Sequence, residues 1–246
     1  NLMRIKIFIL LCLTAIMQFT GVTPLKASHY YYKQLSLKDG LTSVVRCILT
    51  DKQGFVWIGT KAGVSRYDGH ALKKYVHSPN NPHSIPNNLI HQIAEDEMSN
   101  IWILTDKGIA RYQRQSDDFF LPTDEKGNPI IAYSTCLTKD GVLFGSKDKV
   151  YFYSYRDSSL RLLQKLNKGS NFNISLLSLW NEHTVLCCSR WQGLALLDLN
   201  TGKHRLPPFD CGKEIMNMLI DSQNRIWIAP YNEGIKCFTH NGELVK

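Results

Sequence analysis

The sequence predicts an all-β fold, a β-propeller built of four-stranded antiparallel blades, with about five blades present in the 246 residues. Three observations predict it. An apolar segment recurs with Trp57, Trp102, Leu143, Leu186 and Trp227 at the same place, at intervals of 45, 41, 43 and 41 residues, and one blade takes about 40 to 45 residues. Aromatic and β-branched residues bounded by Gly, Asn and Asp dominate the chain, as in strands. The recurring segments, such as "VWIGT" and "IWILT", are almost wholly apolar, which indicates strands covered on both faces.

The first segment of the chain differs from the rest. Arg4 and Lys6 precede an apolar run at 7–17, and a more polar stretch follows that ends in "PLKAS". This is the order of regions in a secretory signal peptide, with cleavage near Ala27. A transmembrane anchor is the rival interpretation, but the run is shorter than the roughly 20 residues that cross a bilayer. We therefore expect 1–27 to be a signal peptide and the remainder to be exported to the periplasmic face of the membrane.

The repeats divide the remainder, 28–246, into blades. The expected bounds of the blades are 40–82, 83–127, 128–168, 169–210 and 211–246. Each blade reads as a weakly apolar strand, a turn, a strongly apolar strand, a hairpin and a third strand, followed by a looser fourth strand. The segment 29–37, "HYYYKQLSL", is a possible outer strand that closes the last blade of a ring. Two arrangements stay open: a five-bladed ring, or, as we favour, the N-terminal piece of a longer sensor with more blades.

Several residues of the repeat have a predicted structural role. Asp51 begins a turn, because its side chain can accept a hydrogen bond from the backbone two residues on. Gly54 stands in a turn where a left-handed backbone would favour glycine, and Gly63 and Gly108 close the hairpins that follow. A single four-stranded sheet cannot bury two apolar faces, whereas sheets stacked around an axis can. The recurring tryptophans are therefore expected to fill the wedge between adjacent blades: Trp57, Trp102 and Trp227.

Composition excludes several functional classes. The formal net charge of +8 is mild, and the Lys and Arg residues are not concentrated in a basic stripe, so nucleic acid is not an expected partner. No C-x-x-C pair and no histidine spacing typical of a metal site occurs, so neither a metal nor a cofactor is expected. No nucleophile motif occurs, and we assign no catalytic residue. The apolar surroundings of the cysteines favour buried free thiols, while export leaves at least one disulfide as the alternative.

The candidate ligand site lies on one face of the blades. Antiparallel strand order places the hairpin between the second and third strands on the same face as the segment that enters each blade, and loops on a rigid scaffold often bind ligands. The predicted ligand-binding residues of this face are Arg190, Trp191, Tyr231, Asn232, Lys61, Lys147, Asn87, Asn88 and His91. Trp191 stands at a hairpin tip beside Arg190, which suits a flat platform for a sugar ring. The alternatives are that Trp191 folds over a neighbouring blade, that His91 is a core histidine, and that the others are solvated turn residues.

The segment "GLTSVVRCILTDKQGFVWIGTKAGVSRYDG" at 40–69 carries an Asp-x-x-Gly turn, a Trp-Ile-Gly-Thr strand and an Arg-Tyr-Asp ending. With the copies at 85–112 and 215–238, it resembles the two-component regulator propeller repeats, whereas the third and fourth copies diverge. The resemblance implies the exported N-terminal sensor region of a hybrid two-component histidine kinase/response regulator protein of gut bacteria. It implies an oligosaccharide ligand and, as partners, a downstream kinase region or remaining blades of the same protein. A homodimer is also open, and membrane contact is expected only through a downstream span outside this chain.

Three functions follow from the residues and the resemblance. The favoured one is a periplasmic sensor that recognises a glycan fragment and signals to the kinase. The second is a protein-interaction scaffold on the same propeller, without a small ligand. The third and least favoured is a glycan-cleaving propeller enzyme, since this region shows no recognisable catalytic motif.

Overall fold

The computed structural model describes residues 34–36, 40–41, 44–166, 172–212 and 214–245. The chain divides into two units, 1–34 and 35–246, and the description below concerns the second. The predicted signal peptide at 1–27 lies outside the described residues. Of the predicted outer strand at 29–37, only 34–36 are described, and they form no strand.

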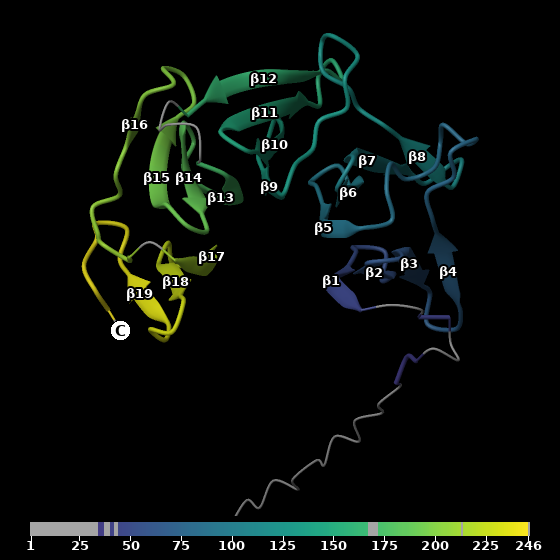
Figure 1. Ribbon diagram of the computed structural model, residues 1–246, viewed down its shortest axis with the longest axis horizontal. Coiled ribbons are helices and arrows are strands. Elements are labelled where there is room, and N and C mark those ends of the chain that lie inside the picture. Colours follow the sequence, from purple (N-terminus) through teal and green to yellow (C-terminus); the bar gives the residue numbers. More distant parts are fainter. Residues whose placement is uncertain (1–33, 37–39, 42–43, 167–171, 213, 246) are drawn as a thin grey trace, which may run out of the picture. The chain divides into compact units, whose positions relative to one another are not determined.

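The described residues form five antiparallel sheets, each with its strands in chain order (Figure 1). The first sheet consists of β1 (Val45–Thr50), β2 (Val56–Thr60), β3 (Gly63–Tyr67) and β4 (Leu72–Tyr75). The second consists of β5 (Ile90–Glu95), β6 (Ile101–Thr105), β7 (Gly108–Gln113) and β8 (Asp118–Phe120). The third consists of β9 (Ser134–Leu137), β10 (Gly141–Ser146), β11 (Lys149–Ser154) and β12 (Leu160–Lys165).

The fourth sheet consists of β13 (Ile174–Asn181), β14 (Thr184–Ser189), β15 (Gly193–Asp198) and β16 (His204–Arg205). The fifth consists of β17 (Ile215–Ile220), β18 (Ile226–Pro230) and β19 (Lys236–Phe238). Four blades thus have the expected four strands. The fifth has three within the described residues, because beyond β19 only an isolated bridge joins Phe238 to Leu244.

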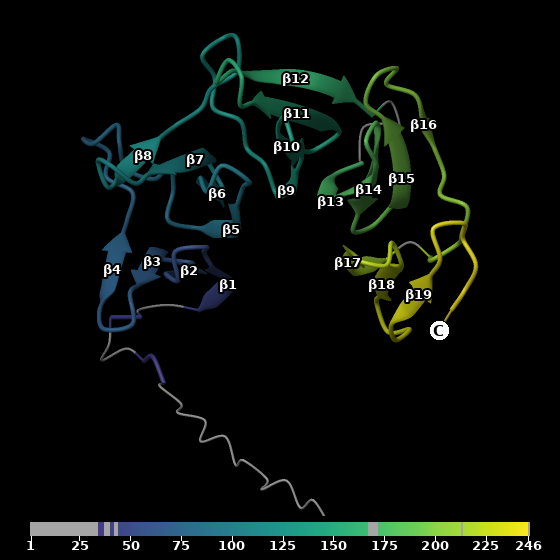
Figure 2. The same cartoon turned by 180° about the vertical axis from the view of Figure 1, so that it is seen from behind.

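The inner strands of successive sheets pack on one another. β1 packs against β5, β5 against β9, β9 against β13, and β13 against β17. Both views show the five sheets following one another around a common centre, with these five strands nearest to it (Figures 1 and 2). The residues described therefore form an all-β propeller, which confirms the predicted fold class.

Two of the recurring tryptophans, Trp57 and Trp102, lie between blades, whereas Trp227, on the last sheet described, is only partly buried. The tryptophan position of the repeat is occupied by Trp57, Trp102, Leu143, Leu186 and Trp227. Trp57 and Trp102 are completely buried. Each meets, edge to face, a tyrosine of the following blade: the ring centroids lie 4.8 Å apart for Trp57 and Tyr112, and 4.7 Å apart for Trp102 and Tyr153. Burying roughly 200 Å² at about 25 cal/mol per Å² contributes about 5 kcal/mol per tryptophan.

The aspartate that begins the turn before each recurring tryptophan also accepts a hydrogen bond from its indole. Asp51 Oδ1 accepts hydrogen bonds from the backbone N–H groups of Gln53 and Phe55, both at 3.0 Å. Its Oδ2 accepts one from Trp57 Nε1 at 2.9 Å. Asp96 and Asp221 accept from the indoles of Trp102 and Trp227 in the same way, at 2.7 and 2.8 Å. One carboxylate therefore fixes the turn and satisfies the indole N–H that the blade buries.

The hairpin glycine is required at the first blade by space as well as conformation. Gly63 has φ of +111°, and a Cβ there would lie 2.4 Å from the carbonyl oxygen of Tyr75. Its N–H donates to the carbonyl of Asn88 at 2.8 Å, which ties the hairpin of blade 1 to the segment that enters blade 2. The β2–β3 hairpin is therefore tied to the segment that enters the next blade.

The cysteines that the structure describes are free thiols, as the sequence favoured. Cys136, Cys187, Cys188, Cys211 and Cys237 are buried, and Cys47 is partly buried. Burial raises the pKa of Cys136 to about 12 and that of Cys47 to about 11. These thiols therefore stay protonated near neutral pH and pack as small apolar groups.

Candidate ligand-binding site

A surface pocket joins the fourth and fifth blades. It has a volume of about 250 Å³ and is lined by Arg190, Trp191, Glu214, Met216 and Tyr231. We call it the Trp191 pocket. Arg190 and Trp191 come from the β14–β15 hairpin, Glu214 and Met216 from the start of β17, and Tyr231 from the β18–β19 hairpin. Three separate segments therefore meet at one place on the face where the sequence predicted a ligand site.

Backbone hydrogen bonds hold these three segments together. The N–H of Ile215 donates to the carbonyl of Arg190 at 3.0 Å, and the N–H of Tyr231 donates to the carbonyl of Glu214 at 2.7 Å. The β14–β15 hairpin has one residue more than that of the first blade, because Ser189 pairs with Gly193 whereas Thr60 pairs with Gly63. The longer loop carries Trp191 out of the sheet, while the backbone bonds keep the pocket walls fixed.

Aromatic rings form the exposed surface of the pocket. Trp191 is 62% exposed and Tyr231 is 53% exposed, so the indole is not folded away under a neighbouring blade. The guanidinium carbon of Arg190 lies 5.0 Å from the centroid of the Trp191 ring. This cation–π contact holds the cation beside the indole and restricts the rotation of the indole. Large aromatic groups exposed in this way are expensive in water and mark binding surfaces.

The two charged side chains of the pocket are free to bind a ligand. Within the described part of the chain, neither Arg190 nor Glu214 makes an ion pair or a side-chain hydrogen bond to protein. Arg190 offers several N–H donors in a planar fork, and Glu214 offers two acceptor oxygens. The pocket therefore combines apolar ring faces with one donor group and one acceptor group.

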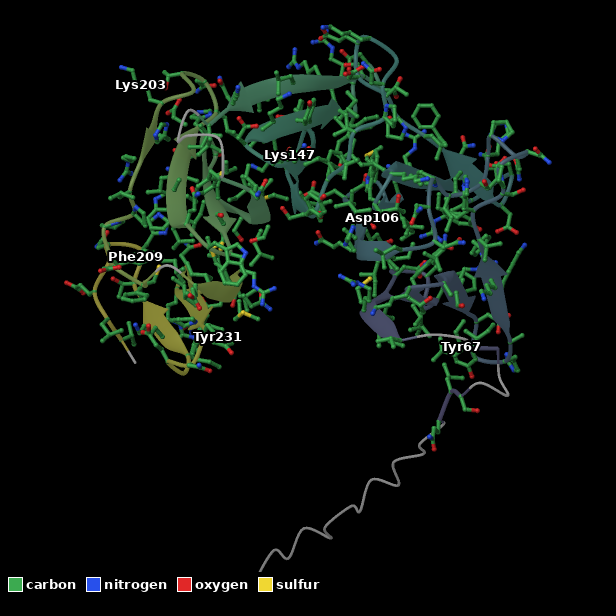
Figure 3. The ribbon with its side chains drawn as sticks, in the orientation of Figure 1. Tyr67, Asp106, Lys147, Lys203, Phe209 and Tyr231 are labelled. Atoms are coloured by element: carbon green, nitrogen blue, oxygen red, sulfur yellow. The ribbon has the colours of Figure 1, made fainter. Side chains whose placement is uncertain are left out.

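The structure brings only some of the predicted residues to this pocket. It unites Arg190, Trp191 and Tyr231, and Asn232 follows Tyr231 at the tip of the same hairpin with φ of +61°. Lys61 and Lys147 are exposed at the hairpins of other blades. Figure 3 labels Tyr231 and Lys147 on different blades. Lys147 also has a left-handed backbone, with φ of +50°.

Asn87 and Asn88 stabilise their own loop. The side chain of Asn87 accepts a hydrogen bond from the N–H of Leu89 at 2.8 Å, and that of Asn88 accepts one from the N–H of His77 at 2.7 Å. These contacts match the alternative of structural turn residues. His91 lies on β5, where its Nε2 is 2.5 Å from Asp106 Oδ1, away from the Trp191 pocket.

Two pocket residues were missed by the sequence analysis. Glu214 and Met216 flank the buried Ile215 at the start of an inner strand. Their positions carried a usable signal, since strand alternation turns the neighbours of a buried residue outward. Both residues lie at the start of a strand and not at a hairpin tip, where the other residues of the pocket stand.

The described part of the chain shows neither a metal-like cluster nor a membrane span. Its His, Cys, Asp and Glu residues do not gather in a group that could hold a metal ion. Among the residues described, no helix is long and apolar enough to cross a bilayer.

Comparison with known proteins confirms the resemblance. The family model described as two component regulator propeller matches residues 39–62. A 59-residue stretch is 39% identical to histidine kinase P4 of Formosa agariphila, and it covers 24% of this chain and 4% of that protein. The chain therefore carries a two component regulator propeller repeat, and it spans a small part of the curated relative it matches.

Solved structures share the fold. The extracellular domain of a putative hybrid two component system from B. thetaiotaomicron superposes with a TM-score of 0.65 at 21% identity, covering 83% of this chain and 28% of that one. A second such domain from B. thetaiotaomicron has a TM-score of 0.55 at 17% identity, covering 87% and 36%. The propeller of a virginiamycin B lyase from Staphylococcus aureus has a TM-score of 0.62 at 13% identity, covering 87% and 71%. At these identities the likeness concerns the fold.

Proposed function

We propose that this propeller is the periplasmic sensor module of a hybrid two-component regulator, and that it binds a glycan fragment in the Trp191 pocket. The observation that carries the proposal is the meeting of two exposed aromatic rings with an unpaired arginine and an unpaired glutamate. The two component regulator propeller repeat at 39–62 supports the sensor role. Residues 1–27 would direct export and be removed near Ala27.

The chemistry of the pocket suits a sugar. One face of a sugar ring presents C–H groups, which pack on an indole or phenol ring, while its rim presents hydroxyl groups. Glu214 would accept hydrogen bonds from hydroxyl groups, and Arg190 would donate to hydroxyl or carboxylate oxygens. A few convergent polar groups on an apolar floor are the usual composition of a small-ligand site.

Signalling requires partners beyond the ligand. We expect the kinase region of the same protein to receive the signal, across a membrane span outside this chain. Apolar side chains stay exposed on the two inner strands at the ends of the series, Val44 and Ile48 at β1 and Met216 and Leu219 on β17. Exposed apolar faces of this kind mark interaction surfaces. They support contact with remaining blades of the same protein, and also the second candidate function, a protein-interaction scaffold.

Calorimetry against a panel of oligosaccharides tests the proposal. The panel contains neutral and uronic-acid hexasaccharides and the disaccharides cut from the same polymers. We expect at least one to bind, and Trp191→Ala to weaken that binding about tenfold or more, equivalent to about 1.4 kcal/mol. The melting temperature should stay unchanged, because Trp191 is mostly exposed.

Phe120→Ala is the matched control. Phe120 is also an exposed aromatic residue, 38% exposed on outer strand β8, and the guanidinium carbon of Arg111 lies 5.0 Å from its centroid, as Arg190 does from Trp191. It should leave affinity unchanged. A wild-type protein that binds no member of the panel, but captures a protein partner through β1 or β17, would replace the glycan sensor by the scaffold.

A further inference from the structure

A second cluster on the same face resembles the Trp191 pocket in its position. Its members are His91 on β5, Asp106 at the β6–β7 hairpin and Tyr133 just before β9, and we call it the His91 cluster. In blade 2, Ile90 pairs with Thr105, and in blade 5 Ile215 pairs with Pro230. His91 and Asp106 follow the first pair, and Met216 and Tyr231 follow the second. The repeat therefore places His91 and Asp106 where blade 5 places two residues of the Trp191 pocket.

The geometry of the His91 cluster is fixed from three elements. His91 Nε2 lies 2.5 Å from Asp106 Oδ1, and the imidazole meets the Tyr133 ring at a centroid distance of 5.1 Å and an angle of 64°. Backbone bonds hold the members: the N–H of Asp106 donates to Leu89, and that of Tyr133 to Gly145. The side chain of Gln92, next to His91, accepts a hydrogen bond from Thr135 N–H at 3.0 Å, which joins blade 2 to blade 3.

The cluster presents unused binding groups to solvent. Tyr133 is 39% exposed, and the side chain of Asp106 is 44% exposed. Within the described residues, the Tyr133 hydroxyl and Asp106 Oδ2 have no protein partner. The imidazole of His91, by contrast, is 14% exposed. Its contacts with Asp106 and Tyr133 orient the carboxylate and the phenol ring. Figure 3 labels Asp106 on blade 2 and Tyr231 on blade 5.

We propose that the His91 cluster is a second sugar subsite, so that the protein recognises an oligosaccharide through two separate blades. This inference rests on the proposed function. Tyr133 supplies the ring on which a sugar packs, Asp106 Oδ2 accepts from its hydroxyl groups, and His91 positions the carboxylate. Because a long ligand can occupy both subsites at once, its affinity depends on both, in the manner of two linked binding events. Because the Trp191 pocket lies at blades 4 and 5 and the cluster at blades 2 and 3, we expect a disaccharide held in the pocket not to reach the cluster.

The test compares long and short saccharides on the same variants. Calorimetry uses the hexasaccharide that binds most tightly in the panel above, and the disaccharide cut from the same polymer. Tyr133→Ala is expected to weaken hexasaccharide binding about fivefold or more, while the disaccharide binds as to wild type. Asp106→Asn, which keeps the size of the side chain, should give a smaller loss in the same sense. Phe120→Ala is the control for both ligands.

The outcomes separate the subsite from the proposed function. Hexasaccharide binding that is unchanged in both Tyr133→Ala and Asp106→Asn overturns the second subsite and leaves the sensor proposal standing. Equal losses for the two saccharides also overturn it, because the cluster then acts on the Trp191 pocket and not on a distant sugar. A wild-type protein that binds neither saccharide overturns both. If Tyr133→Ala fails to fold, Asp106→Asn carries the test, with a loss confined to the hexasaccharide as the supporting result.

Discussion

The interface between blades 1 and 2 and the interface between blades 4 and 5 place different side chains at equivalent positions of the repeat. In the first, Trp57 packs on Tyr112, and Arg66 donates a hydrogen bond to the hydroxyl of that tyrosine. The interface between blades 2 and 3 repeats this with Trp102, Tyr153 and Arg111, whose Nη1 donates to the hydroxyl at 2.7 Å.

Later in the chain, aliphatic and aromatic side chains take these positions. The tryptophan position is Leu143 and then Leu186, and the tyrosine position is Leu197 and then Phe238. Leu143 packs with Leu197 in one apolar cluster, and Leu186 packs with Phe238 in another. The comparison teaches that large apolar side chains must fill the space between adjacent blades. A tryptophan with an arginine is one of two ways to fill it.

The largest effect expected is the loss of a wedge tryptophan. Trp102→Ala removes contacts to Phe144 and Tyr153 and takes the indole donor from Asp96, so we expect a cost of about 4 to 5 kcal/mol in the free energy of unfolding. Leu143→Ala, at the same position in blade 3, should cost about 3 kcal/mol. Urea unfolding of the two variants measures the difference. A larger loss for Leu143→Ala would show that the polar interfaces are not the stronger ones.

The turn aspartates should differ in importance according to their burial. The carboxylate of Asp51 is fully buried, where it accepts from Trp57 and also from Arg114 of blade 2 at 3.1 Å. That of Asp221 is 18% exposed, and Trp227 is only partly buried. Asp51→Ala should therefore cost about 2 to 3 kcal/mol, because it leaves the buried indole N–H of Trp57 without its acceptor and removes one of several acceptors of Arg114. Asp221→Ala should cost about 1 kcal/mol, since water reaches Trp227. Equal urea midpoints for the two variants would contradict this order.

Acid should act through the same aspartates. Burial by itself would raise the pKa of Asp51, but hydrogen bonds from Trp57, Phe55 and Arg114 outweigh it and hold the pKa below the ordinary value of 3.8. A carboxyl with a lowered folded pKa contributes stability above its ordinary pKa, and this stability is lost as the pH falls through the folded value. We expect the urea midpoint of the wild type to fall below about pH 4. Asp51→Ala should flatten this dependence, and an unchanged slope would assign the acid sensitivity to other carboxyls.

The sequence carried the architecture because the repeat is local. The turn that Asp51 opens, the left-handed Gly54 with φ of +88° and the hairpin at Gly63 lie within a few residues of one another. The spacing between Trp57 and Trp102 then gives the length of one blade, and its recurrence along the chain gives the number of blades. Contacts between blades join residues about forty positions apart. The pairing of Arg66 with Tyr112 is one of them, and it depends on the stacking of blades, which no local pattern specifies.

The candidate site was predicted in part for the same reason. Trp191 is unusual within its own hairpin, and that was enough to single it out. Glu214 and the Asp106–His91 pair acquire their meaning from neighbours on other strands. Asn87 and Asn88 looked like ligand residues, because asparagine at a loop tip serves binding and backbone capping equally well, and here both side chains bond to the backbone.

The smallest effect expected comes from converting one type of interface into the other. In Arg111→Leu, the buried hydroxyl of Tyr153 loses its donor, which should cost about 1 to 2 kcal/mol. Adding Tyr153→Phe removes the orphaned hydroxyl, and it gives the interface between blades 2 and 3 the leucine and phenylalanine that Leu196 and Phe238 supply between blades 4 and 5. The double variant should therefore unfold within about 1 kcal/mol of wild type and cost less than the sum of the single changes. Strict additivity in this double-mutant cycle would mean that Arg111 stabilises the wedge through its stacking on Phe120 and not through the tyrosine hydroxyl.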